Sequence, residues 1–166
     1  MIIYNENEEF MSLKIFIKKI MSFLLTFLVL TGYAMAATVE DVKKNIIEQA
    51  KVMGVEPAIV LSIAKTESGF NQNARSASGH IGVFQLSHST AKNMGLDPYK
   101  LDDNVKGGIM YYKNMYDMFG SMELAVAAYN SGPVAIRHHK NTVPKHSQKF
   151  VNKIMSDYRY YKNIGI

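Results

Sequence analysis

Glu67 is the residue of this chain whose position best suits acid chemistry. Ile59 and Ile63 precede it at intervals of four residues, so the three side chains share one face of a helix. Glu67 is therefore expected to point toward the interior or a cleft wall, in the last turn of its helix. Burial and the free carbonyls of a helix C-terminus both raise the pKa of a carboxyl group, which suits a general acid. The alternative is a boundary Glu that reaches out to solvent.

The elements that position Glu67 are predicted to be mainly α-helical. Pro57 begins the helix that carries Glu67, and Gly69 ends it. The Gly-, Ser- and Asn-rich residues 69–87 that follow are predicted as a loop with short strand pieces. Further helices are expected over residues 38–53, 89–94, 103–119, 122–129 and 147–162. The fold class is therefore mainly α, a single domain with a small irregular and β loop region after the Glu67 helix.

Helix capping and inward stripes complete this prediction. Asp102 or Asp103 is expected to cap the helix over residues 103–119. Its inner face is expected to carry four residues at helical spacing: Val105, Ile109, Tyr112 and Tyr116.

Four segments in chain order resemble one enzyme family. They are residues 67–71 with Ser76 and 79–86; Asn104-Val105 with Gly108 and Tyr111; residues 127–133; and Pro144, Ser147, Phe150-Val151 and Lys153-Ile154. These segments resemble the motifs of the lytic transglycosylases of family 1 type, whose SLT domain is similar to goose-type lysozyme. The resemblance covers about residues 55–162. It implies a lysozyme-like fold and cleavage of the β-1,4 bond between N-acetylmuramic acid and N-acetylglucosamine in peptidoglycan glycan strands.

The resemblance also implies roles for individual residues. Glu67 would act first as general acid and then as base, while the 6-hydroxyl of muramic acid attacks and forms a 1,6-anhydro product. The substrate-binding residues would be Ser76, Gln85, Tyr111, Tyr129 and Asn130. The structural alternatives are a loop-capping hydroxyl for Ser76, core packing for both tyrosines, and a turn before Gly132 for Asn130. The alternative for Gly79 and Gly82, which precede Gln85, is that they only make a tight turn.

Departures from the family pattern accompany the matches. His80 stands where the family usually has Ala, and Val83-Phe84 replaces Leu-Met. Phe150 replaces a Tyr, so any step that relatives assign to that hydroxyl is missing from this chain.

A second carboxylate, as glycoside hydrolases use, is not evident in the motifs. Asp97, Asp102 and Asp103 lie at turn and cap positions, where a structural role is expected. The sequence therefore favours self-attack by the substrate, with a hydrolytic muramidase as the alternative. A non-catalytic wall-binding component of a secretion or pilus apparatus is the alternative of another class.

Composition excludes several other classes. The 166 residues are 48% hydrophobic and contain no Cys, which excludes a wholly disordered chain, a disulfide framework and a thiolate metal site. The five His show no zinc-site spacing, and no phosphate-binding glycine loop occurs, so no metal and no cofactor are expected. No nucleic-acid recognition motif is evident, and a monomer is expected.

The N-terminus has the layout of a secretory signal peptide. Lys14, Lys18 and Lys19 precede an uncharged run from residue 20 to 39, and residues 34–36 suit a cut before Ala37. The expected organisation is an N-terminal extension and signal peptide over 1–36 and the catalytic domain over 37–166. Met11 is the expected true start, because an acidic leader is unusual before an export signal. The product would be exported to the periplasm or cell envelope; a retained membrane anchor is the alternative.

The formal net charge of +5 is concentrated near the C-terminus. Residues 130–166 hold seven basic residues and one acidic residue, whereas residues 37–129 hold nine basic and ten acidic residues. This segment is either a solvated helix face or a surface that attracts acidic stem peptides and wall polymers. The lysines expected to act in that attraction are Lys145, Lys149 and Lys153.

Overall fold

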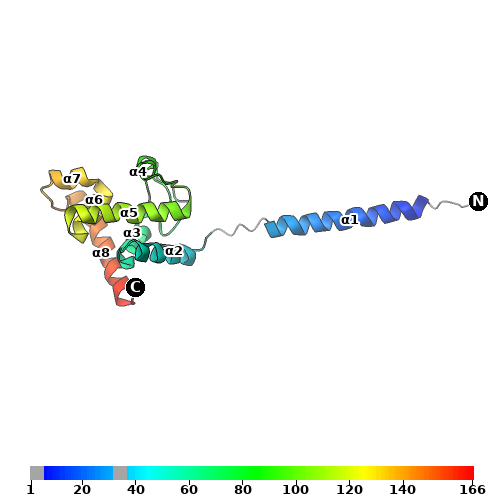
Figure 1. Ribbon diagram of the computed structural model, residues 1–166, viewed down its shortest axis with the longest axis horizontal. Helices are drawn as coiled ribbons and strands as arrows, with labels where there is room; N and C mark the ends of the chain where they lie inside the picture. Colours follow the sequence, from blue (N-terminus) through cyan, green and yellow to red (C-terminus); the bar gives the residue numbers. More distant parts are fainter. Residues whose placement is uncertain (1–5, 32–36) are drawn as a thin grey trace, which may run out of the picture. The chain divides into compact units, whose positions relative to one another are not determined.

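The computed structural model describes residues 6–31 and 37–166, which belong to two compact units, Met1–Ala36 and Ala37–Ile166 (Figure 1). The first unit contains the helix α1 (Glu6–Thr31). Within the described ranges, no helix is both long enough and apolar enough to cross a membrane. The expected cleavage motif at residues 34–36 lies outside the described residues.

The second unit is built from helices, which confirms the predicted mainly α class. They are α2 (Val39–Val52), α3 (Pro57–Ser68), α4 (His88–Asn93), α5 (Leu101–Phe119), α6 (Met122–Ser131), α7 (Pro133–His138), the 3-10 helix η1 (Lys145–Ser147) and α8 (Gln148–Asn163). Over residues 37–166 the only β pairing is two isolated bridges, Arg75–Ile81 and Ile81–Leu86. They lie in the segment between α3 and α4, where short strand pieces were expected.

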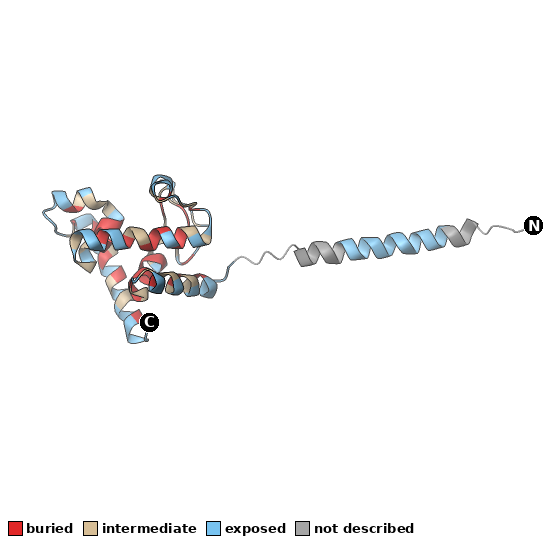
Figure 2. Ribbon diagram, viewed as in Figure 1, coloured by how far each residue is buried: buried red, intermediate tan, exposed pale blue. Residues whose placement is uncertain are grey.

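Helix α3 is the centre of the second unit. Every residue from Ala58 to Ala64 is buried, and α3 packs mainly against α8 and α2 (Figure 2). Pro57 suits the first turn because it lacks an N–H group that would otherwise be unpaired there. Gly69 ends the helix with a φ of 63°, a left-handed conformation that glycine adopts without a steric penalty. The helix therefore stops directly after the turn that contains Glu67.

Two details of α5 differ from the sequence prediction. Tyr116 is 43% exposed, so its predicted inward orientation is wrong. The buried stripe passes from Tyr112 to Met115 instead, and the Tyr116 ring lies against Tyr112 with centroids 6.3 Å apart. Asp102 and Asp103 are also not the cap: Lys100 occupies that position, and both acids lie in the first turn, where negative charge is favourable.

Candidate active site

A cleft of about 430 Å³ lies where the end of α3 meets the 69–87 loop, α5 and α6. The residues that line it are Glu67, Ser76, Ser78, His80, Gln85, Leu86, Ser87, Thr90, Tyr111, Tyr129, Asn130 and Gly132. All six residues that the sequence nominated are therefore brought to one cavity. They come from segments up to 63 positions apart, Glu67 and Asn130 being the extremes.

Glu67 carries the only carboxyl group among these lining residues. Its side chain is half-buried, and burial raises its pKa from 4.5 to about 7. No hydrogen bond or ion pair to the Glu67 carboxyl occurs within residues 37–166, so nothing there offsets the loss of hydration. A carboxyl group with this pKa is present in both protonation states near neutral pH, as an acid–base catalyst requires.

The floor of the cleft is anchored by Asn104, which is fully buried at the start of α5. Its Oδ1 accepts a hydrogen bond from the Phe84 N–H at 2.9 Å, and its Nδ2 donates to the Ile81 and Pro98 carbonyls at 2.8 and 3.0 Å. These bonds pair the Phe84 N–H and tie two further backbone carbonyls to α5. Asn104 therefore fixes the loop that faces Glu67.

Two glycines allow this close packing. A Cβ atom on Gly108 would lie 2.1 Å from Cγ of Phe84, and one on Gly82 would lie 2.4 Å from Nδ2 of Asn104. Gly82 also has a φ of 78°, in the region that favours glycine. The glycines of the two motifs are thus required by contacts beneath the cleft.

Tyr129 holds the same loop from the side of α6. Its hydroxyl donates to the Phe84 carbonyl at 2.8 Å, and its ring meets that of Tyr111 edge-on at a centroid distance of 5.1 Å. Burial, and next the nearby Glu67 charge, hold the pKa of Tyr129 well above its ordinary value. Burial also raises the pKa of Tyr111. Tyr129 therefore stays neutral, and its hydroxyl is engaged by the loop backbone.

Gln85 and Asn130 also make contacts inside the protein. Gln85, at a φ of 46°, donates from Nε2 to the carbonyls of Gly82 at 2.9 Å and Ala74 at 3.4 Å. Its amide oxygen is the atom left for a ligand. Asn130 is exposed, and its Oδ1 accepts a hydrogen bond from Ser147 Oγ at 3.2 Å, which joins α6 to η1.

Serines organise the loop between α3 and α4. Ser76 Oγ accepts a hydrogen bond from the His80 N–H at 3.0 Å, which is the loop-capping geometry. Ser68, directly after Glu67, donates to the Val83 carbonyl at 2.8 Å and accepts from the Asn71 N–H at 3.0 Å. The two hydroxyls replace regular secondary structure in this segment.

Several lining residues were not nominated from the sequence: Ser78, His80, Leu86, Ser87, Thr90 and Gly132. A sequence signal existed for His80, because it departs from the family pattern between two glycines. Phe150, another departure, lies half-buried in α8 against the core and does not line this cleft. Phe150 therefore contributes no group to the cavity.

Comparisons with known proteins agree with this architecture. Residues 44–152 match the Transglycosylase SLT domain family, and the chain belongs to that family. The transglycosylase of Enterobacteria phage PRD1 is 32% identical over 79 residues, which are 47% of this chain and 30% of that protein. The membrane-bound lytic murein transglycosylase F of Shewanella pealeana is 34% identical over 90 residues, covering 48% of this chain and 18% of that protein. The chain thus spans less than a third of either relative.

Solved structures share the fold. The lytic transglycosylase Slt of Pseudomonas aeruginosa, solved as an inactive mutant, superposes with a TM-score of 0.66 at 26% identity over 72% of this chain and 24% of that one. The 70 kDa soluble lytic transglycosylase of Escherichia coli gives a TM-score of 0.63 at 22% identity, over 72% of this chain and 24% of that one. The lysozyme-like prediction is therefore confirmed at the level of the fold.

Proposed function

We propose that this protein is a peptidoglycan lytic transglycosylase in which Glu67 is the single acid–base catalyst. The observation that carries the proposal is the half-buried Glu67 carboxyl, with a pKa raised to about 7, in a cleft lined by no other carboxyl group. Family membership gives the substrate class, peptidoglycan glycan strands. The solved Pseudomonas aeruginosa relative, described as inactive, carries a Glu-to-Gln change, which fits dependence on one carboxyl group.

The reaction requires two proton transfers and no water. Protonated Glu67 donates its proton to the glycosidic oxygen as the bond between that oxygen and C1 of muramic acid breaks. The 6-hydroxyl of the same sugar then attacks C1, and the Glu67 carboxylate takes the hydroxyl proton. The products are a glycan with a free 4-hydroxyl and a 1,6-anhydromuramic acid end, and Glu67 regains its starting state.

The single carboxyl group favours this route over hydrolysis. Glycoside hydrolases use a second carboxylate as nucleophile or as base for water, and among the residues lining this cleft Glu67 is the only acid. An attacking hydroxyl on the substrate is already close to C1, so a high effective concentration replaces the second carboxylate.

Tyr129, Gln85 and Asn130 serve this chemistry by shaping the cleft. Asn104 accepts from the backbone N–H of Phe84 and Tyr129 donates to its carbonyl, and Gln85 offers its amide oxygen to an N–H group of an acetamido sugar. Asn130 and Tyr111 line the side toward α6 and α5. Ser76 acts through the loop it caps.

The proposal includes export. Residues 1–36 would act as the N-terminal extension and signal peptide, with residues 37–166 as the SLT domain in the periplasm or envelope. Fractionation of cells that express the chain with a C-terminal tag tests this directly. A tagged product that starts at Ala37 in the envelope fraction supports export, and full-length product in the cytosol contradicts it.

Product analysis tests the chemistry. Purified sacculi are digested with the wild-type chain, and the released sugar ends are identified by mass spectrometry. The expected ends are 1,6-anhydromuramic acid, lighter by one water molecule than hydrolysed ends. Reducing muramic acid ends would instead identify a hydrolytic muramidase.

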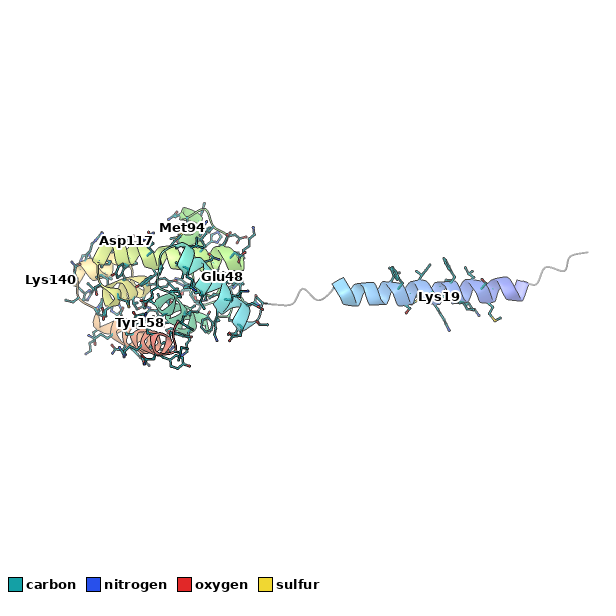
Figure 3. All side chains as sticks on the ribbon, turned by 60° about the horizontal axis from the view of Figure 1, so that its bottom comes forward. Lys19, Glu48, Met94, Asp117, Lys140 and Tyr158 are labelled. Carbon is teal, nitrogen blue, oxygen red and sulfur yellow. The ribbon has the colours of Figure 1, made fainter. Side chains whose placement is uncertain are left out.

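Glu67→Gln and Glu48→Gln form a matched pair for the same assay. Glu48 is an exposed residue of α2 that does not line the cleft (Figure 3), so its neutralisation is expected to leave product formation unchanged. Glu67→Gln is expected to release no anhydro ends above background. Equal product from Glu67→Gln and wild type would overturn the role of Glu67, and sacculus binding without release by the wild type would indicate a wall-binding component.

A further inference from the structure

His80 is the feature of the cleft that the proposed chemistry does not use. It is half-buried, lines the cavity together with Glu67, and stands between the two glycines of the loop, Gly79 and Gly82. Its backbone is fixed from both sides: its N–H donates to Ser76 Oγ at 3.0 Å, and its carbonyl accepts from the Ser76 N–H at 3.1 Å. The imidazole is therefore carried by a rigid part of the loop.

The imidazole is oriented by two serine hydroxyls. Its Nδ1 lies 2.9 Å from Ser78 Oγ and 3.4 Å from Ser76 Oγ, and the two hydroxyl oxygens are 3.1 Å apart. Because Ser76 Oγ accepts the His80 N–H, its own proton suits a bond to Ser78 Oγ, and the Ser78 proton then suits Nδ1. In this arrangement Nδ1 is the acceptor and the ring proton is on Nε2.

Nε2 is consequently a hydrogen-bond donor without a partner in residues 37–166. None of the residues that line the cleft is Lys or Arg. The Gln85 amide already donates to two loop carbonyls. In this arrangement the Nε2–H of His80 is a side-chain donor without a partner in the cleft, whereas the Gln85 side-chain N–H groups are already engaged.

We propose that His80 is a substrate-binding residue that donates a hydrogen bond from Nε2 to a carbonyl or carboxylate oxygen of the glycan strand. The proposal rests on the proposed function for its substrate class. Two parts of a peptidoglycan strand present such oxygens: the sugars, with their acetamido and lactyl groups, and the peptide stem. Both are acceptors of the same chemistry, and the substrates of the test separate them.

Two amide variants separate binding from a loop-supporting role. In His80→Asn the amide occupies the place of Nδ1, so the bond to the serine hydroxyls is kept and the cleft donor is lost. In His80→Gln the amide nitrogen reaches the place of Nε2, so a donor toward the cleft is kept. His138→Ala is the control, because His138 is exposed on α7 and does not line the cleft.

The measurement is the Kd of two glycan ligands, peptide-bearing strands and strands stripped of their stems by an amidase, in a Glu67→Gln background that leaves the strands intact. KM and kcat are measured in parallel with Glu67 present. We expect His80→Asn to raise Kd and KM about 3- to 10-fold, the effect of one lost hydrogen bond, with kcat within about twofold of wild type. His80→Gln and His138→Ala are expected to stay within about twofold in all three quantities.

Weaker binding by His80→Asn on both ligands assigns the acceptor to the sugars, and weaker binding on peptide-bearing strands alone assigns it to the stem. Unchanged Kd on both ligands overturns the proposal. So does an equal loss in His80→Asn and His80→Gln accompanied by a lower Tm, because that pattern is the signature of loop support. A wild-type chain that binds strands but never cleaves them contradicts the proposed function and leaves the Kd comparison decisive for His80.

Discussion

The cleft and the C-terminal basic segment (residues 130–166) use charge in opposite ways. The cleft lining has one carboxyl group and no Lys or Arg, and that carboxyl is half-buried. The C-terminal basic segment has seven basic residues and one acidic residue, and its Arg137, Lys140, Lys145 and Lys149 are exposed. Figure 3 labels Lys140, at the turn that follows α7.

The contrast shows that hydration decides what a charge can do. Glu67 is deprived of water, and its pKa moves into the range where it can give and take a proton. Exposed lysines keep their water, so they attract anions over a distance set by the ionic strength and contribute little energy each. One partly buried charged group can therefore control a proton transfer, whereas several exposed charged groups only favour the approach of a ligand of opposite charge.

The largest effect is expected from moving the cleft carboxyl without removing it. Glu67→Asp keeps the acid but withdraws it by one methylene, and a displacement of about 1 Å at a reacting group costs about 10²-fold in rate. We expect kcat on sacculi to fall by about this factor, measured by release of anhydro ends. A rate within a few-fold of wild type would mean that the position of the acid is not critical. It would weaken the contrast between the cleft and the C-terminal basic segment.

The pH dependence of the reaction gives the next effect. In the proposed reaction Glu67 donates the first proton, and its pKa is raised to about 7 by burial, so the active form would be lost as the pH rises through that value. We expect kcat/KM to fall about tenfold per pH unit well above pH 7. The initial rate at low substrate is followed across the pH range on peptide-free strands. A basic limb that begins near 4.5, the unshifted value, would show that the cleft is hydrated in solution.

Removing the Glu67 carboxyl should abolish activity but increase stability, and wild-type stability, like activity, should fall as the pH rises. Because the folded-state pKa of Glu67 is raised from 4.5 to about 7, folding is disfavoured as the pH rises between these values, and the penalty is complete above them. Glu67→Gln removes the buried charge, so we expect it to be more stable than wild type at pH 8 by about 1–3 kcal/mol.

Urea unfolding at pH 4 and at pH 8 measures the difference in stability between Glu67→Gln and the wild type. The advantage of Glu67→Gln should shrink toward zero near pH 4, where the carboxyl is protonated in both states. A stability difference that is the same at every pH would show that packing, and not charge, causes it.

The smallest effect is expected in the C-terminal basic segment. Lys145→Gln with Lys149→Gln removes two exposed charges, while Lys153 is left in place because it contacts Thr66 at 3.0 Å and Asp157 at 3.7 Å. We expect sacculus binding to weaken about two- to fivefold at low salt and the difference to vanish near 0.5 M salt. Lys44→Gln with Lys51→Gln, on α2, is the charge-matched control. An equal loss of sacculus binding in the control would show that net charge, and not the position of the lysines, causes the effect.

The sequence was a good guide to helices and to the membership of the cleft. Periodic apolar residues mark α2, α3, α5 and α8, because a long amphipathic helix repeats its signal over several turns. Helix α7 was not predicted, because Gly132-Pro133 indicates a break in a helix, whereas in the structure Pro133 lies in the first turn of α7. Motif residues converge on one cavity because the motifs themselves mark the segments that surround it.

The hydrogen-bond partners of those residues could not be predicted from the sequence. Tyr129 was predicted to bind substrate or to pack in the core, and its hydroxyl bonds to the Phe84 carbonyl, 45 positions away in the chain. Nothing local in either segment encodes that pairing, which depends on how α6 is set against the loop. Asn104 is a similar case: its motif was recognised, but its three bonds to the loop and to Pro98 arise only in the folded chain.

Phe84 joins the loop, α5 and α6 at one point. Its N–H is held by Asn104, its carbonyl by Tyr129, and its ring covers Gly108, where no side chain would fit. A molecule that loses this arrangement also loses the packing between those helices. Heating should therefore abolish turnover and helical circular dichroism in a single transition. A sample that regains its helical circular dichroism on cooling should regain its full turnover at the same time.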